Sequence, residues 1–309
     1  MMHNPLEQLH TEQRNTSTIG IASCTTLEML EKINDEDQKV AAQVRKALPD
    51  VARAVELIVE RMRHGGRLVY AGAGTSGRLG YMDAAECRPT YGIAENKVSC
   101  VMAGGRDAVF SAKESLEDDR AGAREDLRQW GLLPADVVVA AAASGRTPYC
   151  IGALDYAREI GAGAISIACN PGSAMSAHAD VAIEVDTGAE AIMGSTRMKA
   201  GTAQKMIMNM LSTAAMVRLG RTYDNLMICL RARNGKIAYR MVRLYCEATG
   251  CTDEEEARRA LRAADGQLDI AIFMQKAACT KEDAEKAFSE TFDIRARIEK
   301  AEQATPTNG

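Results

Sequence analysis

The stretch YAGAGTSGRLGYMDAAECRPTYG, Tyr70 to Gly92, follows an apolar run and carries three glycines in the spacing G-x-G-x-x-G. A strand, a glycine-rich turn and a helix in this order are typical of phosphate-binding loops in α/β proteins, including the dinucleotide fingerprint. Two hydroxyl-bearing residues, Thr75 and Ser76, stand in the middle of the turn. The stretch therefore predicts an anion site that takes either a dinucleotide or a smaller phosphate compound.

A dinucleotide requires an acidic residue at the end of the second strand, about 20 residues beyond the glycines, to bind the ribose hydroxyls. Glu95 has nearly that spacing, but it precedes the second predicted strand, whose far end reads MAGGRDA. Because the acid is in the wrong place, the pattern favours the smaller phosphate compound.

Short apolar or β-branched runs alternate with segments that are long enough to hold a crossover helix. The runs are residues 67–71, 97–103, 137–143, 164–168 and 181–185. This alternation predicts an α/β fold in which a parallel sheet is flanked by helices on both faces.

The remaining segments show helical periodicity and define the expected domain organisation. Residues 1–64 are predicted to be an N-terminal helical segment that packs on the core, 65–224 the sheet domain that carries the phosphate site, and 225–309 a small all-α domain. Within the last part, the helix pattern of residues 249–272 resembles ubiquitin-associated modules, which we interpret as a similarity of packing. The helix predicted at Thr202–Leu219 is apolar almost all round, so it is buried either against the sheet or against a second subunit.

The composition of the 309-residue chain limits its partners and its location. A net charge of −4 gives no reason to expect nucleic acid or anionic lipid as a partner. No apolar run approaches the roughly 20 residues that a membrane-spanning helix needs, and the polar start lacks the apolar core of a secretory signal. We therefore expect a cytoplasmic protein.

Nine cysteines and four histidines raise the question of a metal site or a nucleophilic mechanism. The cysteines are scattered without a C-x-x-C pair, and most stand among small apolar residues, where a free thiol behaves as a hydrophobic side chain. The histidines lie away from the glycine-rich loops, which disfavours Ser-His-Asp or Cys-His catalysis. No metal is expected.

Two further strand ends carry small, hydroxylated turns like the first. One turn, SGRTPY, leads into a helix with Pro148 in its first turn, and the other, GSTRMKAGTAQK, leads into the apolar helix. Three such turns predict one site in which a phosphate monoester receives hydroxyl groups and backbone N–H groups at helix N-termini. The predicted substrate-binding residues are Thr75, Ser76, Ser144, Thr147, Ser195 and Thr196.

At this level of detail the chain resembles the N-acetylmuramic acid 6-phosphate etherases, bacterial enzymes of the sugar isomerase (SIS) fold. The likeness covers nearly the whole chain and is densest between residues 67 and 219. The motifs that carry it are TEQRN (11–15), INDED (33–37), GAGTSGRLG (72–80), DAAEC-PTYG around Glu86, SGRTPY (144–149), CNPGS (169–173) and GSTRMKAGTAQK (194–205).

The resemblance implies a lyase that cleaves the D-lactyl ether at C3 of the sugar, giving N-acetylglucosamine 6-phosphate and D-lactate during the recycling of cell-wall muropeptides. An ether resists direct displacement by water, but in an open-chain aldose the proton at C2 is acidic because it lies next to the aldehyde. Its removal lets the C3 oxygen leave, and water then adds to the unsaturated aldehyde. Two carboxyl groups suffice as base and acid, so no metal or redox cofactor is expected.

By resemblance, Glu86 matches the family's catalytic acid and Glu117 its second catalytic carboxylate. Glu86 is predicted near the end of the first crossover helix, just before Pro89 breaks it, and Glu117 on the second crossover helix. Without the motif context, both would read as solvated helix charges. The family's usual proline after the cysteine is replaced by Arg88.

Glu86 poses a geometric difficulty. If a helix begins near Ser76, Glu86 lies about ten residues or roughly 15 Å along it, farther than one hexose 6-phosphate spans. Either Gly80 bends the segment, or Glu86 serves the phosphate that is bound by a partner subunit. The second possibility predicts a homodimer with composite active sites.

Two other functions fit the same loops. A non-catalytic phosphosugar sensor would resemble the glucokinase regulatory protein, which has two SIS domains where this chain carries one. A ketose/aldose phosphate isomerase would share the phosphate site and act without releasing lactate.

Overall fold

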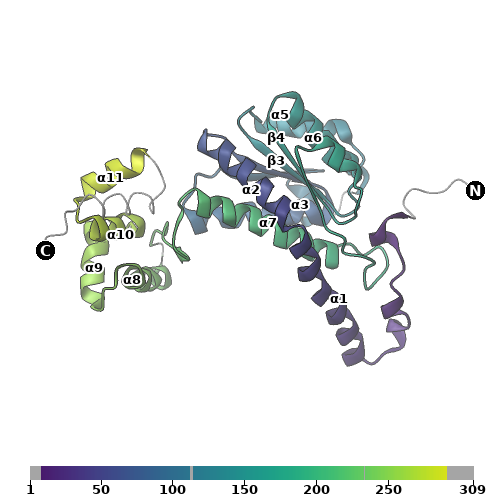
Figure 1. Ribbon diagram of the computed structural model, residues 1–309, viewed down its shortest axis with the longest axis horizontal. Coiled ribbons are helices and arrows are strands. Elements are labelled where there is room, and N and C mark those ends of the chain that lie inside the picture. The colour runs from purple at the N-terminus through teal and green to yellow at the C-terminus, as the bar shows by residue number, and fades with distance from the viewer. Residues whose placement is uncertain (1–7, 112–113, 233, 291–309) are drawn as a thin grey trace, which may run out of the picture. The chain divides into compact units, whose positions relative to one another are not determined.

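The computed structural model describes residues 8–111, 114–232 and 234–290 (Figure 1). The chain divides into two compact units, Met1–Ala85 with Glu95–Thr213, and Glu86–Ala94 with Ala214–Gly309. The predicted N-terminal helical segment therefore belongs to the same unit as the sheet.

The first unit is built on a five-stranded parallel sheet with the strand order β2-β1-β3-β4-β5. The strands β3 and β4 are buried along their whole length, which explains why β3 consists of Val and Ala and why β4, with the sequence GAISIA, carries a single polar residue, Ser166. The predicted fold class is confirmed. The strands are β1 Leu68–Gly72, β2 Val98–Met102, β3 Val137–Ala142, β4 Gly163–Ala168 and β5 Val181–Glu184.

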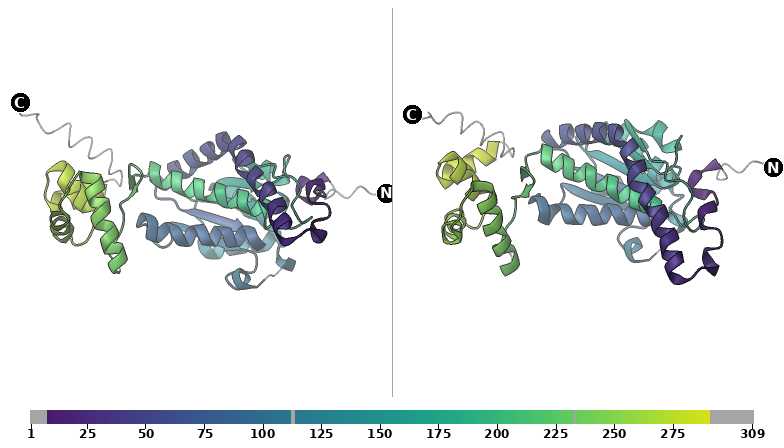
Figure 2. Two further views of the ribbon diagram at one scale, coloured as in Figure 1. Left: turned by 90° about the horizontal axis from the view of Figure 1, so that it is seen from below. Right: turned by 60° about the horizontal axis from the view of Figure 1, so that its bottom comes forward.

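Helices cover both faces of this sheet (Figures 1 and 2). One face packs against α5 (Arg120–Trp130) and α6 (Pro148–Glu159), and the other against α2 (Leu48–Arg63), α3 (Gly74–Tyr91) and α7 (Lys199–Arg218). The helix α3 leaves β1 on one face and α6 leaves β3 on the other. The chain therefore leaves these two neighbouring strands toward opposite faces of the sheet.

The prediction that α3 ends before Pro89 is wrong, because α3 continues to Tyr91 with Pro89 inside it. A proline in the last turn of a helix removes a single backbone donor. Around it, the Thr90 hydroxyl donates to the Glu86 carbonyl at 2.7 Å, and the Gly92 N–H donates to the Arg88 carbonyl at 3.0 Å. These bonds keep the turn closed.

Gly80 in α3 is explained by close packing. A Cβ at this position would lie 2.8 Å from the Cβ of Tyr70 on β1, so only glycine lets the helix approach the strand this closely. Three residues further on, the buried carboxylate of Asp83 accepts hydrogen bonds from the Tyr70 hydroxyl at 2.7 Å and from Ser212 of α7 at 3.1 Å. Burial raises the pKa of Asp83. These contacts hold α3 against β1 and α7.

Residues 8–25, the N-terminal strap, precede the helix α1 (Thr26–Lys46). The strap runs beside the segment that follows β5. Asn15 donates to the Ala189 carbonyl at 3.1 Å, and the Thr18 hydroxyl donates to the Ala191 carbonyl at 2.8 Å. The strap is therefore part of the loop layer at the carboxyl end of the sheet.

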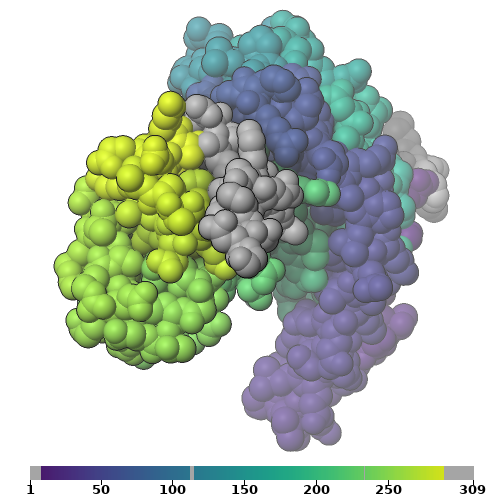
Figure 3. All heavy atoms as spheres, turned by 60° about the vertical axis from the view of Figure 1, so that its left-hand side comes forward, coloured from purple at the N-terminus to yellow at the C-terminus, as the bar shows by residue number. Residues whose placement is uncertain are grey.

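The described part of the second unit contains a short hairpin, β6 (Thr222–Tyr223) and β7 (Leu226–Met227), and helices that pack around their own apolar core. Figure 3 shows these helices as one closely packed body. None of the described helices is long and apolar enough to span a bilayer. The helices are α8 Gly235–Thr249, α9 Glu254–Ala263, α10 Leu268–Ala277 and α11 Lys281–Glu290.

Candidate active site

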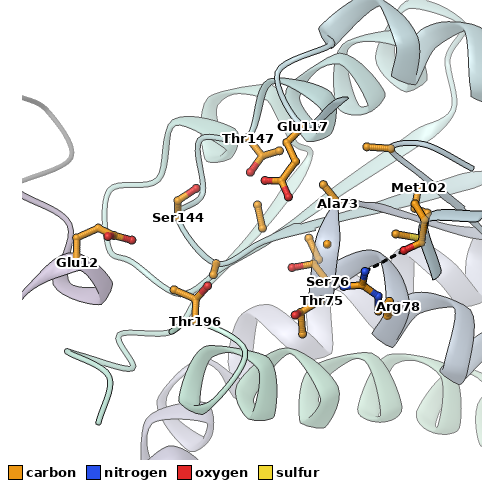
Figure 4. Close-up of a pocket in the computed structure, with 16 residues that line it drawn as sticks. Glu12, Ala73, Thr75, Ser76, Arg78, Met102, Glu117, Ser144, Thr147 and Thr196 are labelled. Carbon is orange, nitrogen blue, oxygen red and sulfur yellow. Dashed lines mark hydrogen bonds between the residues drawn. The ribbon is translucent and has the colours of Figure 1, made fainter. Parts of the chain in front are cut away.

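A cavity of about 350 Å³ lies at the carboxyl ends of β1 and β3 (Figure 4). Because the connections from these two strands go to opposite faces, the cavity occupies the switch point of the sheet, where α/β proteins usually bind ligands. Five of the six predicted substrate-binding residues line it, namely Thr75, Ser76, Ser144, Thr147 and Thr196. The half-buried Ser195 is not among the lining residues.

The first wall of the cavity is the N-terminus of α3. Gly74 has φ +50°, and a Cβ built on it would lie 3.2 Å from Oε1 of Glu117, so this glycine lets the carboxylate lie against the helix end. Thr75 and Ser76 follow in the first turn, where backbone N–H groups have no partner within the helix. This end of the cavity therefore offers both hydroxyl and N–H donors.

Ser76 is buried and donates to Oε1 of Gln204 on α7 at 2.8 Å. The amide nitrogen of Gln204 is buried and has no hydrogen-bond partner among the described residues. A half-turn of that amide makes its NH₂ group the donor to Ser76 and frees the serine proton for an anion in the cavity. Rotation of the Gln204 amide can therefore release the Ser76 hydroxyl from its bond to Gln204 and make it a donor to a ligand, without any movement of the backbone.

The second wall is the turn between β3 and α6. Gly145 has φ +68°, and a Cβ there would lie 2.3 Å from Oγ of Ser173, so no other residue fits this turn. The Ser144 hydroxyl accepts the N–H of Arg146 at 3.3 Å. Thr147 is the N-cap of α6 but makes no side-chain capping bond, which leaves its hydroxyl available to the cavity.

The third wall is the segment before α7, which contributes Thr196. The buried carboxylate of Glu190 fixes this segment, because it accepts the N–H of Lys199 at 2.9 Å and that of Ala200 at 3.0 Å. Burial raises the pKa of Glu190. The carboxylate thereby caps α7 from outside the helix and holds the preceding loop against the cavity.

Glu117 lines the cavity, but the prediction that it lies on a helix is wrong. Asp119 caps α5 by accepting the N–H of Gly122 at 2.8 Å, so that helix begins at Arg120 and Glu117 falls in the turn before it. The Glu117 carbonyl accepts the N–H of Tyr149 at 3.0 Å. This bond ties the turn to α6 beside the hydroxylated loop.

Glu86 does not line the cavity. It is exposed on α3, and the uninterrupted helix separates it from Ser76 by about ten residues, or roughly 15 Å. The structure of one chain therefore brings Glu117 together with the phosphate-binding loops and leaves Glu86 outside.

Two charged lining residues were not predicted, Glu12 and Arg78. Arg78 belongs to the glycine-rich motif, and its Nε and Nη2 donate to the carbonyls of Val109 and Ala108, each at 2.9 Å. Glu12 belongs to the TEQRN motif, and the pattern of that motif assigns no role to any of its residues. Among the described residues, no three His, Cys, Asp or Glu side chains gather as a metal site.

Comparison with known families identifies three matching regions. Residues 50–158 match the glucokinase regulatory protein N-terminal SIS domain, residues 132–214 the SIS domain, and residues 240–273 a UBA-like domain. The last of these agrees with the helix pattern that resembles ubiquitin-associated modules.

Individual relatives match over nearly the full chain. The N-acetylmuramic acid 6-phosphate etherase of Clostridium beijerinckii is 48% identical over 279 residues, which covers 90% of this chain and 91% of that protein. The etherase of Mycolicibacterium smegmatis is 50% identical over 294 residues, covering 95% and 98%. Among solved structures, a phosphoheptose isomerase from Francisella tularensis superposes with a TM-score of 0.50 at 15% identity, over 62% of this chain and 98% of that one. At that identity the isomerase shows the fold alone.

Proposed function

The chain belongs to the N-acetylmuramic acid 6-phosphate etherase family, and on this premise we propose how the cavity converts N-acetylmuramic acid 6-phosphate to N-acetylglucosamine 6-phosphate and D-lactate. The observation that carries the proposal is the presence of a carboxylate, Glu117, in the same cavity as three hydroxylated loops. Incubating the protein with the substrate and measuring released D-lactate tests the function directly.

The 6-phosphate binds between the N-termini of α3 and α6. Each helix end contributes about 0.3 to 2 kcal/mol toward an anion, and the hydroxyls of Ser76, Ser144 and Thr147 add direct hydrogen bonds. Several donors together give the affinity that one helix end cannot. This arrangement leaves the carbon chain of the sugar to extend past Glu117.

Glu117 acts as the base that removes the C2 proton from the open-chain substrate. The electron pair moves to form the C2–C3 double bond, and the C3 oxygen leaves as D-lactate after it has received a proton. Water then adds at C3 of the unsaturated aldehyde. We assign protonation of the leaving oxygen to Glu86 of a second copy of the chain, because Glu86 does not line its own cavity.

A second copy also fits the surface of α7. The residues Met206, Met210 and Ala214 are only half-buried and Val217 is exposed, and their spacing places them along one side of the helix. Such an apolar stripe is covered when two copies pair around a two-fold axis. We therefore propose a homodimer. All nine cysteines are free thiols, which suits the reducing cytoplasm, where we place the reaction.

The phosphate assignment predicts a loss of affinity on removal of single hydroxyls. Ser76→Ala and Ser144→Ala should each weaken binding of N-acetylglucosamine 6-phosphate roughly tenfold to a hundredfold, because each removes a hydrogen bond to a charged group. Calorimetry measures the effect. Ser195→Ala is the matched control and should bind as wild type does, since Ser195 does not line the cavity. Equal affinity of wild type for the phosphorylated and unphosphorylated sugars would contradict the site.

The lactyl carboxylate is the second anion of the substrate, and Arg78 is the cationic side chain that lines the cavity in the described part of the chain. Arg78→Gln should raise KM for N-acetylmuramic acid 6-phosphate roughly tenfold to a hundredfold and leave the affinity for N-acetylglucosamine 6-phosphate unchanged, since the product lacks the lactyl group. An equal loss for both sugars would place Arg78 on the phosphate instead.

Lactate release also separates the etherase from the two other functions considered. A sensor would bind the sugar phosphate without turnover, and an isomerase would interconvert aldose and ketose phosphates without releasing lactate. The identity with named etherases over nine-tenths of the chain favours the lyase.

A further inference from the structure

The N-terminal strap delivers a second carboxylate to the cavity from a distant part of the sequence. Thr11 is fully buried, and its N–H donates to Oδ1 of Asn170 at 3.2 Å. The amide of Asn170 donates back to the Thr11 hydroxyl at 2.9 Å and to the Ala143 carbonyl at 3.0 Å. The strap is thus bonded to the ends of β3 and β4, and the next residue is Glu12.

The Glu12 side chain is half-buried and reaches the cavity (Figure 4). In that view Ser144 lies between Glu12 and Glu117, so the two carboxylates approach the cavity from different sides. Among the described residues, Glu12 has no hydrogen-bond or ion-pair partner that would hold its carboxylate. Its oxygens are therefore free to exchange a proton with a ligand.

The proposed reaction requires a step that neither Glu117 nor Glu86 performs. A hexose 6-phosphate exists in water mainly as a closed ring, and its C2 proton becomes acidic only when C1 is an aldehyde. Opening the ring removes the proton from the O1 hydroxyl and breaks the C1–O5 bond, whose electron pair goes to O5. Of the residues that line the cavity, two carry carboxyl groups, Glu12 and Glu117. Glu117 already has the role of removing the C2 proton.

We propose that Glu12 is the general base that opens the sugar ring. Its carboxylate accepts the O1 proton as the C1–O5 bond breaks, O5 takes a proton from water, and Glu12 then releases its proton to water, so the net change moves one proton from O1 to O5. C1 and C2 are adjacent, so this role requires the bound sugar to present O1 to Glu12 and the C2 proton to Glu117 within the one cavity that both side chains line. This role rests on the proposed function and adds a second catalytic residue from the same chain.

The test uses the product sugar, which has no ether to cleave. Ring opening and closing interconverts the α and β anomers, and exchange NMR of N-acetylglucosamine 6-phosphate labelled at C1 measures the rate. The wild-type protein should accelerate this interconversion. Glu12→Gln should lower the enzyme-dependent rate about a hundredfold or more, the usual size of a general-base contribution, while Asp118→Asn, which neutralises an exposed carboxylate that does not line the cavity, should retain it.

Binding of the product by calorimetry separates a catalytic role from a structural one. Glu12→Gln should bind N-acetylglucosamine 6-phosphate as tightly as wild type, and Glu12→Asp should recover part of the exchange rate. Normal anomer exchange in Glu12→Gln overturns the proposal, and so does a loss of product affinity in that variant, which would show that the strap only shapes the cavity. If wild type releases no lactate, the proposed function itself fails, whatever the anomer exchange shows.

Discussion

Replacing Glu117 by glutamine is expected to lower kcat for lactate release by about a hundredfold to ten-thousandfold, which is the range for loss of a positioned base. Glutamine keeps the size of the side chain and cannot accept the C2 proton. The first step should therefore fail, and with it the exchange of the C2 proton with deuterated water. Lactate release and deuterium incorporation are measured on the same samples, the second by NMR.

Replacing the two carboxylates assigned to ether cleavage should block different steps of the reaction. Glu86→Gln should also stop lactate release, but it should leave C2 exchange measurable, because protonation of the leaving oxygen follows removal of the C2 proton. Asp118→Asn is the matched control for Glu117→Gln, since it neutralises the adjacent carboxylate, which is exposed and does not line the cavity. If Glu117→Gln exchanges the C2 proton while Glu86→Gln does not, the two roles are reversed.

The sheet could be predicted because buried parallel strands need continuous apolar runs, and each such run in residues 67–185 became a strand. Helix ends were harder to predict, because each depends on the hydrogen bonds of one or two residues. Asp119 caps α5, so that helix begins after Glu117. Pro89 is accommodated in the last turn of α3, so that helix does not end before it. Short-range patterns do not reveal which of several neighbouring polar residues accepts the capping bond.

The hydroxylated loops could be predicted to share one cavity because they all follow strands of the same parallel sheet. Glu12 could not be placed there from local pattern. Its position depends on the bonds between Thr11 and Asn170, which are separated by 159 residues. The one available signal was the TEQRN motif, a short polar segment that resembles the etherases.

A second prediction with a large effect on lactate release concerns the assembly of the site from two chains. Mixing Glu86→Gln with Glu117→Gln under conditions where subunits exchange should restore lactate release to about a quarter of the wild-type value. In a mixed dimer with composite sites, one site receives both altered residues and the other receives both native carboxylates. Since random pairing makes about half of the dimers mixed, and each has one working site of two, a quarter of the sites are active.

The control for this experiment combines residues that line one cavity of one chain. Glu117→Gln mixed with the double variant Ser76→Ala, Ser144→Ala should recover no activity at substrate concentrations below KM, because each cavity of a mixed dimer lacks either the base or the phosphate donors. Native mass spectrometry of the mixtures verifies that subunits have exchanged. If exchange is complete and the Glu86→Gln and Glu117→Gln mixture stays inactive, Glu86 does not act across a dimer. The exposed position of Glu86 on α3 would then exclude it as the acid, and protonation of the leaving oxygen would fall to a group within the cavity.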